Sequence, residues 1–311
     1  MILVAGSANL DFVVRAAHIP APGETVLGRD FKTYPGGKGA NQAVAAARAG
    51  AATTHMLLAL GADAHAAVLE QSLQQAGVHS HIVRDTQQAS GTAFICVSDN
   101  AENAITVAPG ANLSLRAADL PPLDGFSHLL LQLETPLATV WAYARAAHAQ
   151  GVIVVLNAAP AQALDADLLA LIDVLIVNQG ELATVARHQG SIAECLARIA
   201  VPTVVVTLGV HGCCARCDGD ITLQSAFAVK SVDTTGAGDT FCGVLVAALS
   251  RGEALAQAMR QASAAGALAC TRAGAQSSIP TQAELMAFLA SQPVATATQS
   301  DALQRYCGFA S

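Results

Sequence analysis

An aspartate follows a run of small residues at the point where an apolar helix is expected to begin. The stretch "DTTGAGDTFCG" covers residues 233–243 and places Asp239 directly after Gly236, Ala237 and Gly238. Apolar residues then recur at the i, i+3, i+4, i+7 and i+8 spacing of a helix with one buried face, so we predict that the helix begins near Gly238. The N–H groups of a first helical turn lack intrahelical partners and carry the positive end of the helix dipole. The stretch therefore predicts an anion-binding hole.

Asp239 itself has two interpretations. A carboxylate would repel a phosphate held at this helix end, so Asp239 is unsuited to binding the phosphate. It is suited to act as a base that takes the proton from a hydroxyl attacking the phosphate. Alternatively, Asp239 is an acid in the first turn that stabilises the helix through its dipole. The residues of this stretch alone do not choose between the two interpretations.

A second glycine-rich stretch, "PGGKGANQAVAAARAG", opens an Ala-rich helix. It is no Walker A loop, because Lys38 is followed by Gly39 rather than by Ser or Thr, and no G-x-G-x-x-G follows the first predicted strand. A tight backbone at Gly36 and Gly37, from which Lys38 and Asn41 emerge, suits a polyhydroxylated ligand that needs many donors and acceptors. The alternative is a tight turn without a ligand.

Polar residues follow four of the predicted strands. Glu134 comes after "LLLQL", Asn157 after "VIVVL", Asn178 after "VLIV" and Thr207 after "TVVV". Open α/β sheets bind ligands beyond the carboxyl ends of their strands, so we expect these four residues to share one crevice. Each of them taken alone could simply cap its strand.

The elements that must position these residues alternate along the chain. Short apolar runs and longer Ala-rich helical stretches predict an α/β fold, with a mostly parallel sheet between two layers of helices. Two stretches, 11–35 and 91–108, look like strands without intervening helices and predict a small accessory sheet or lid. We expect one domain over residues 1–290 and a tail over 291–311 with no assigned role. The predicted strands lie near 2–5, 54–60, 127–132, 152–156, 174–177 and 203–206, and the predicted helices near 38–49, 64–76, 137–149, 180–188, 239–250 and 253–270.

Composition excludes several classes of protein. The 311 residues carry a formal net charge of -7 and no Lys/Arg cluster, which disfavours nucleic-acid binding. No secretory signal and no membrane-spanning run is visible, so we expect a cytoplasmic protein without a membrane partner. The eight scattered cysteines are typical of reduced thiols. In "HGCCARC", Cys213, Cys214 and Cys217 beside His211 could be a metal site, but a second ligand pair is missing, and a strand leaving a turn is the favoured interpretation.

The two glycine-rich stretches together resemble the two signatures of the PfkB carbohydrate kinases. "GGKGANQA" and "DTTGAGDTF" match them, and the resemblance runs from the first strand to about residue 290. Further support comes from "GSANLDFV", "PAPGETVLG", "ENAITVAPGAN", "LQLETP", "LNAAPA" and "TRAGAQSSIP". Within the family, the chain most resembles the members that phosphorylate D-ribose to D-ribose 5-phosphate. Two features depart from the family pattern, "GADAHA" and Gly180 in "NQGE".

The resemblance implies a role for each matched residue. Asp239 would be the catalytic base, with the anion hole at Gly236, Ala237 and Gly238. The sugar would be held by Asn9, Asp11, Gly37, Lys38, Asn41, Glu134 and Asp239. ATP would be held by Asn178, Thr207, Gly209, Gly212 and Gly238, and Asn178 and Glu181 would organise Mg²⁺ through water. A monovalent cation, usually K⁺, would be held by Asp233, Thr235, Ala269, Arg272, Gly274 and Ser278.

The expected activity is therefore ATP-dependent phosphorylation of a sugar hydroxyl, with D-ribose as the substrate. Such chemistry needs in-line positioning, neutralisation of the γ-phosphate and a base, and a closing lid would exclude water. The resemblance also implies a homodimer formed through the lid. Two alternatives stay open at this point: a kinase of another pentose or of a nucleoside, and a catalytically idle sugar-binding regulator. The presence of Asp239 and of the complete anion hole argues against the idle regulator.

Overall fold

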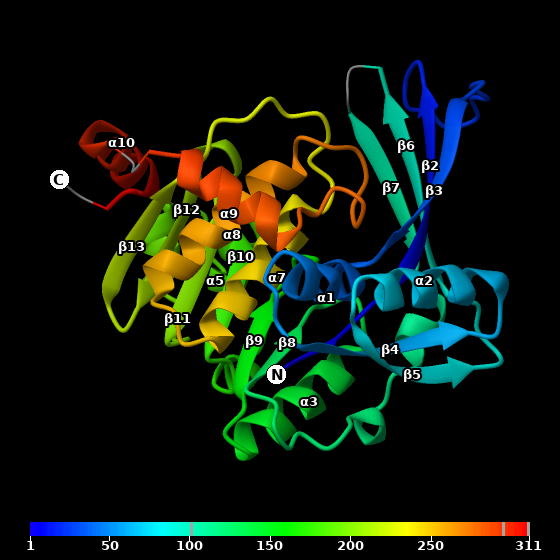
Figure 1. Cartoon of the computed structure of the whole chain (residues 1–311), viewed down its shortest axis with the longest axis horizontal. Helices are drawn as coiled ribbons and strands as arrows, with labels where there is room; N and C mark the ends of the chain where they lie inside the picture. Colours follow the sequence, from blue (N-terminus) through cyan, green and yellow to red (C-terminus); the bar gives the residue numbers. More distant parts are fainter. Residues whose placement is uncertain (100–101, 294–295, 310–311) are drawn as a thin grey trace.

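A large, mostly parallel sheet forms the centre of the molecule (Figure 1). The computed structural model describes residues 1–99, 102–293 and 296–309; residues 100–101 of the expected lid strands, and 294–295 and 310–311 of the expected tail, lie outside the described residues. The nine strands follow the order β13-β12-β11-β10-β9-β8-β1-β4-β5, and only the β11–β12 and β12–β13 pairs are antiparallel. Their bounds are β1 Ile2–Ala5, β4 Thr54–Gly61, β5 His79–Asp85, β8 His128–Leu131, β9 Ile153–Asn157, β10 Val174–Asn178, β11 Thr203–Thr207, β12 Gly212–Cys217 and β13 Asp220–Ser225.

The central strands are buried on both faces because their sequences are nearly continuous apolar runs. In β1 all four residues are at most 2% exposed. This pattern is typical of parallel strands covered by helices on both sides. All six strands predicted from such runs are present. The edge strand β5, which the sequence analysis missed, reads "HSHIVRD" and has exposed positions at His79 and Ser80, so it lacks the apolar signal.

Helices cover both faces of the sheet, which confirms the predicted three layers. On one face α1 (Lys38–Arg48), α2 (Ala64–Gln75), α7 (Ala237–Ser250), α8 (Leu255–Ala269) and α9 (Gln282–Ser291) enclose one core. On the other face α3 (Leu137–Ala149), α4 (Ala166–Leu169), α5 (Gln179–Ala186), α6 (Ile192–Leu196) and α10 (Ala297–Cys307) enclose a second core. Within the described ranges, no helix combines the length and the apolar character that a membrane crossing requires.

Helices α1 and α7 pack closely enough to bring their side chains into one site. Gly243 of α7 faces the backbone of α1, where a β-carbon would overlap the carbonyl oxygen of Gln42 and would lie 2.7 Å from Cβ of Ala45. At Gly50, just beyond α1, a β-carbon would overlap Cβ of Ala247. The absence of side chains at these two glycines therefore sets how near the two helices lie.

A second sheet of four strands projects beyond the large one (Figure 1). Its order is β3-β2-β6-β7, with bounds β2 Asn9–Ala16, β3 Arg29–Gly36, β6 Gly91–Ser98 and β7 Asn103–Ala108. It contains the strands that were expected in the accessory sheet. Apolar side chains stay exposed on it: Phe31 is 63% exposed, Phe94 54% and Ile105 55%. Phe12 stacks between Phe31 and Phe94, with ring centroids 6.1 Å and 5.4 Å apart.

The C-terminal segment forms a helix that docks on the large sheet's side of the molecule. Helix α10 lies beside β13 (Figure 1). Its Leu303 and Cys307 are buried at 4% and 0% exposure in the second core. The helix begins with a capping box between Thr296 and Gln299 and ends at Gly308 in the left-handed conformation. Helix α10, in the tail for which no role was predicted, is thus part of the folded structure.

Candidate active site

A small cavity of about 170 Å³ opens at the carboxyl ends of the central strands. Three of the four polar residues predicted at strand ends line it: Asn157, Asn178 and Thr207. Glu134 lies elsewhere, where it accepts hydrogen bonds from Ser7 Oγ at 2.5 Å and from the backbone N–H of Lys38 at 3.2 Å. The predicted crevice exists, and the fourth residue lies outside the cavity lining. The remaining lining residues are Lys38, Ala159, Ile176, Val177, Glu181, Gly236, Gly238, Asp239 and Cys242.

Asp239 lies in the first turn of α7 and is held by two amide groups of α1. Its carboxylate accepts hydrogen bonds from Nδ2 of Asn41 at 2.9 Å and from Nε2 of Gln42 at 3.0 Å. The helix begins at Ala237, one residue before the predicted start. Gly236 precedes it with φ 73, a left-handed conformation that favours glycine. The carboxylate is thus fixed at the end of a helix and borders the cavity.

Gln42 is a site residue that the sequence analysis missed. Its Nε2 also donates to Oδ1 of Asn157 at 2.9 Å, and its Oε1 accepts from Nε2 of Gln132 at 2.7 Å. Gln42 and Gln132 are fully buried and Asn157 is 7% exposed. Buried polar groups linked in this way hold one another in a single arrangement. The one available signal was the position of Gln42 next to Asn41 in the glycine-rich stretch.

The glycines of "PGGKGANQ" allow the first strands to approach the start of α1. Gly37 has φ 89, and a β-carbon on it would lie 2.7 Å from Cα of Ala8. A β-carbon at Gly39 would lie 2.7 Å from the carbonyl carbon of Gly6. At Gly36 it would overlap the carboxylate of Asp11. The turn is therefore tight because the backbone at Gly6 and Ala8 leaves no room for side chains at Gly37 and Gly39, and the carboxylate of Asp11 leaves none at Gly36.

Asn9 and Asp11 lie at the base of β2 in the small sheet and point into the same region as Asp239. Both are buried, at 3% and 8% exposure. Burial, followed by the negative charges of Glu134 and Asp239, raises the pKa of Asp11 to about 7. Oδ1 of Asn9 accepts a hydrogen bond from Nδ2 of Asn112 at 2.8 Å. Asn112, 1% exposed, is a second residue of the site region that was missed.

The side-chain oxygen of Asn41 is a hydrogen-bond acceptor without a donor. The side chain is 5% exposed, its nitrogen donates to Asp239, and its Oδ1 is buried with no hydrogen-bond partner in the structure. A buried acceptor without a partner is costly. A hydroxyl group of a bound ligand would supply the missing donor.

Lys38 is the cation of the small cavity. It lines the cavity together with Asn178, Glu181 and Asp239, while its backbone N–H reaches Glu134. The negative charge of Asp239 raises the pKa of Lys38, burial opposes this rise, and the charge of Glu134 adds to it. A Lys amine at the closed end of a cavity that borders a helix N-terminus suits a phosphate.

Asn178 and Glu181 form a capping box at the start of α5. The backbone N–H of Asn178 donates to Oε2 of Glu181 at 2.8 Å, and the N–H of Glu181 donates to Oδ1 of Asn178 at 2.9 Å. Burial raises the pKa of Glu181, and the bond from Asn178 partly offsets this. Across the described ranges, no group of three or more His, Cys, Asp or Glu side chains could hold a metal. The carboxylate of Glu181 nevertheless suits Mg²⁺, because this ion keeps several water ligands and needs only one or two carboxylates from the protein.

A larger pocket of about 450 Å³ adjoins the small cavity. The two share Thr207 and Gly238 in their linings, and Gly209 and Gly212 line the larger pocket as well. Its walls are mostly apolar and come from α7, α8, the residues before α7 and the turn after β11. Thr234, Ala237, Gly238 and Phe241 belong to the "DTTGAGDTF" stretch, but most of the other wall residues stand in no motif, so few of them were predicted. The other lining residues are Val210, Ala226, Phe227, Ala228, Val229, Ser231, Thr234, Ala237, Phe241, Ser263, Gly266, Ala267 and Cys270.

Asp233 joins the two segments that were predicted to hold a monovalent cation. Its Oδ1 accepts from the N–H of Thr235 and its Oδ2 from the N–H of Gly274, both at 2.9 Å. Burial raises the pKa of Asp233, but these hydrogen bonds outweigh it and the pKa is lowered overall. Ala269 is the last residue of α8, and the Ser278 hydroxyl donates to the Ala275 carbonyl at 2.8 Å. Asp233 thus links residues 233–235 to Gly274 in one double loop.

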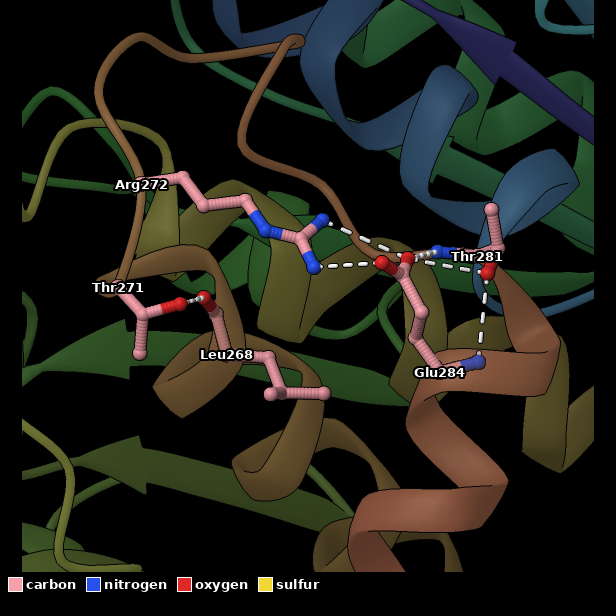
Figure 2. Close-up of polar contacts among 5 residues, drawn as sticks. All are labelled: Leu268, Thr271, Arg272, Thr281 and Glu284. Atoms are coloured by element: carbon pink, nitrogen blue, oxygen red, sulfur yellow. Dashed lines mark hydrogen bonds and ion pairs between the residues drawn. The ribbon is translucent and has the colours of Figure 1, made fainter.

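The side chain of Arg272 points toward Glu284 at the start of α9 (Figure 2). Its guanidinium reaches the Glu284 carboxylate of α9, with N–O distances of 2.5 Å and 3.4 Å. Glu284 also accepts from the N–H of Thr281 at 2.7 Å, and hydrogen bonds from Arg272 and then Thr281 lower its pKa to about 2. Arg272 can thus offer a cation only its backbone carbonyl, while its side chain ties the loop to α9.

Comparison with known proteins places these features in a family. The pfkB family carbohydrate kinase model matches residues 1–282. The ribokinase of Haemophilus influenzae is 39% identical, covering 93% of this chain and 98% of its own length. The ribokinase of Bacillus subtilis is 36% identical, covering 93% of this chain and 99% of its own length.

Solved structures agree with these sequence matches. The Thermotoga maritima ribokinase superimposes with a TM-score of 0.85 at 34% identity, covering 93% of this chain and 99% of that one. The Arabidopsis thaliana ribokinase, solved with ribose and ATP, gives a TM-score of 0.83 at 28% identity, covering 94% of this chain and 99% of that one.

Proposed function

The chain belongs to the PfkB family of carbohydrate kinases, and from that premise we propose that it transfers the γ-phosphoryl group of ATP to D-ribose, giving D-ribose 5-phosphate and ADP. The observation that carries this proposal is the position of Asp239. The carboxylate borders the small cavity, lies in the first turn of α7, and is bonded to Asn41, whose oxygen awaits a donor. A base there adjoins both a polyol site and a phosphate site.

The reaction follows from this placement. Asp239 takes the proton of the ribose 5-hydroxyl as its oxygen attacks the γ-phosphorus, and the bond to the bridging oxygen of ADP breaks. The bonds from Asn41 and Gln42 hold the carboxylate in place for this step. Little covalent chemistry is left to the protein, so positioning and charge stabilisation supply most of the rate.

Three contributions would stabilise the charge that develops on the phosphoryl group. The N–H groups of Gly236, Ala237 and Gly238 stand at the positive end of the α7 dipole, and Lys38 lines the same cavity as Gly236 and Gly238. Glu181, assisted by Asn178, would hold the waters of a Mg²⁺ ion, which neutralises phosphate charge when bound. The larger, mostly apolar pocket would then take the adenosine part of ATP.

A monovalent cation would bind the double loop around Asp233. The contact between Asp233 and Gly274 joins residues 233–238, which form the anion hole, to the loop after α8. A cation there, usually K⁺ in this family, would order these N–H groups. Activity should fall when K⁺ is replaced by Na⁺ or by a bulky organic cation, and equal rates in all three salts would rule out this role.

The ribose site is proposed from buried polar groups. Asn9, Asp11 and Asn41 are each at most 8% exposed, and Gly37 and Glu134 complete the surrounding shell. A site built on such groups rejects ligands that leave them unpaired, often by about 10⁴. A nucleoside presents most of the same hydroxyls, so ribose is favoured over it by the similarity to ribokinases, one of them solved with ribose and ATP.

The small sheet is proposed as both lid and dimer contact. By strand register, Asp11 and Val107 both pair with Ala93, so they lie on one face of this sheet, and Phe94 lies on the opposite face. The first face would close over the sugar, and the second, with exposed Phe31 and Phe94, would receive a second copy of the chain. The eight free cysteines and the use of ATP suit a cytoplasmic location.

An assay of ADP release tests the proposed activity. The purified protein is supplied with ATP, Mg²⁺, K⁺ and a panel of pentoses, hexoses and nucleosides. We expect ribose to give the highest kcat/KM, and mass spectrometry to find the phosphate at the 5-position. A nucleoside that exceeds ribose by tenfold would replace the proposed substrate, and the absence of turnover with every acceptor would favour the idle regulator.

A further inference from the structure

Tyr306 of the C-terminal helix α10 bridges two segments of the large domain. Its ring stacks on His211, with centroids 3.9 Å apart and ring planes inclined by 24°. Its hydroxyl oxygen lies 3.0 Å from Oε1 of Gln179, to which it donates a hydrogen bond. A single side chain therefore contacts two segments that are distant in sequence, one at Gln179 and the other at His211.

Both segments belong to the proposed ATP site. His211 ends the short 3₁₀ helix η3 (Gly209–His211), and Gly209, Val210 and Gly212 line the larger pocket. Gln179 is the first residue of α5 and directly follows Asn178, which lines the small cavity. Tyr306 thus reaches the outer side of the turn at the nucleotide pocket and the start of the helix at the phosphate cavity.

The turn that carries His211 is conformationally permissive. Gly209 has φ 55 and Gly212 has φ 107, and both values fall in the region that favours glycine. Val210, between them, is 88% exposed. A turn with two such glycines has many accessible conformations, and ordering it on binding costs conformational entropy. A contact that already holds the turn in the free protein removes part of this cost.

Helix α10 is anchored firmly enough to provide that contact. Leu303 and Cys307, on either side of Tyr306 in sequence, are buried in the core. Tyr306 itself is 42% exposed. Replacing Tyr306 therefore removes the stacking and the hydrogen bond but leaves the docked face of the helix unchanged. The family match ends at residue 282, before α10 begins, so the family machinery alone does not include this contact.

We propose that Tyr306 is a positioning residue for the nucleotide, which holds the turn at Gly209–Gly212 and the start of α5 in the arrangement that binds ATP. The inference rests on the proposed function, because it requires ATP in the larger pocket. Tyr306 lines neither the small cavity nor the larger pocket. An aromatic stack and a neutral hydrogen bond of this kind together correspond to roughly a five- to 150-fold change in an equilibrium constant. We expect a change at the lower end for ATP, because part of the turn's order survives without Tyr306.

The test separates ATP affinity from turnover. For Tyr306→Ala we expect KM for ATP, and Kd for ATP by calorimetry without ribose, to rise about five- to tenfold. We expect kcat and KM for ribose to stay within about twofold. Tyr306→Phe keeps the ring and should recover most of the ATP affinity. Arg305→Ala, on the neighbouring exposed residue of the same helix, is the matched control and should match the parent in all constants.

A double-mutant cycle sharpens the assignment. His211→Ala should raise KM for ATP in the same way. The double variant should show little further change, because each substitution removes the same stacking contact between Tyr306 and His211. An unchanged KM for ATP in Tyr306→Ala would overturn the inference, as would an equal rise in the KM values for ATP and ribose. A parent protein that binds no ATP would overturn the inference and the proposed function together. If the parent phosphorylates ribose and Tyr306→Ala has the parental KM for ATP, the inference is overturned and the proposed function is not.

Discussion

The large and the small sheet contribute to one site under opposite conditions of burial. The large sheet has helices on both faces, and its central strands are almost completely inaccessible. The small sheet keeps aromatic and aliphatic side chains at more than half exposure, among them Phe31 and Phe94. Burial in the large sheet fixes side chains in place, whereas the small sheet leaves an apolar surface that a ligand or a second copy of the chain could cover.

This difference divides the proposed work of the site. The large domain holds Asp239 through a buried chain of amides from Gln132 to Gln42, which suits a group that must keep one position. The small sheet contributes Asn9 and Asp11 at its base, where β2 leaves the large domain. A ligand held by both parts would join them. We therefore expect changes at Asp239 and its amide partners in the large domain to affect turnover, and changes on the face of the small sheet that carries Phe31 and Phe94 to affect assembly.

The largest expected effect concerns Asp239. Asp239→Asn keeps the size of the side chain but removes the proton acceptor, and we expect kcat to fall by at least roughly 10². The melting temperature should change little, because an acid in a first helical turn contributes only about 0.3–1 kcal/mol. Glu194→Gln, in the first turn of α6, is the matched control and should leave kcat unchanged. An Asp239→Asn variant with more than half the parental kcat would assign Asp239 to helix stability alone.

A smaller effect is expected on the outer face of the small sheet. Phe94→Ser removes an exposed ring that stacks on Phe12, and a dimer would lose two such rings, one from each protomer. Burial of part of a Phe side chain is worth about 1 kcal/mol, so the dimer dissociation constant should rise by about tenfold or more. Analytical ultracentrifugation measures this constant. Met286→Ser on α9, a residue that is 52% exposed, is the control. A parent that sediments as a monomer, or a variant as tightly dimeric as the parent, would contradict the proposed interface.

The smallest expected effect is a pH dependence of opposite sign in the two regions. Burial, then the N-terminal ammonium, lowers the pKa of His128 in the large sheet from 6.5 to about 4, so its contribution to stability is lost as pH falls from about 6.5 to 4. The pKa of Asp11 is raised from 3.8 to about 7, so the stability that it contributes at low pH is lost as pH rises through about 7.

The two contributions can be separated by melting temperatures between pH 4 and pH 8. Relative to the parent, Asp11→Asn should gain stability as pH rises, and His128→Asn should gain stability as pH falls. Each kcal/mol corresponds to about 2–4 °C for a chain of this size. Differences that stay constant over this range would show that neither group changes its protonation on unfolding.

The elements that were predicted most accurately have local signals. The glycine-rich turns placed the start of α7 within one residue and the start of α1 at Lys38, because tight backbones at helix starts need small residues. Buried strands such as β1 were visible as apolar runs. The edge strand β5 was not, since an edge strand buries too little to require such a run.

The site was only partly predictable for a related reason. Asp239 and Asn41 stand in motifs, whereas Gln42 and Asn112 act through partners at least 90 residues away in sequence. Apart from the "DTTGAGDTF" stretch, the walls of the larger pocket come from separate segments that carry no recognisable motif. Tyr306 belongs to the same class, because its importance depends on where α10 docks.

Gly243 gives the molecule a constraint that no ligand-contact map would reveal. It touches no predicted substrate atom, yet it lets α7 rest against the backbone of α1 at Gln42. A methyl group there would act as a wedge and lengthen the bonds from Asn41 and Gln42 to Asp239. Any programme of directed evolution that randomises only pocket-lining positions would leave this spacer untouched. Conversely, in an inactive variant that keeps every ligand contact, the residues between α1 and α7 are the first place to look for the responsible substitution.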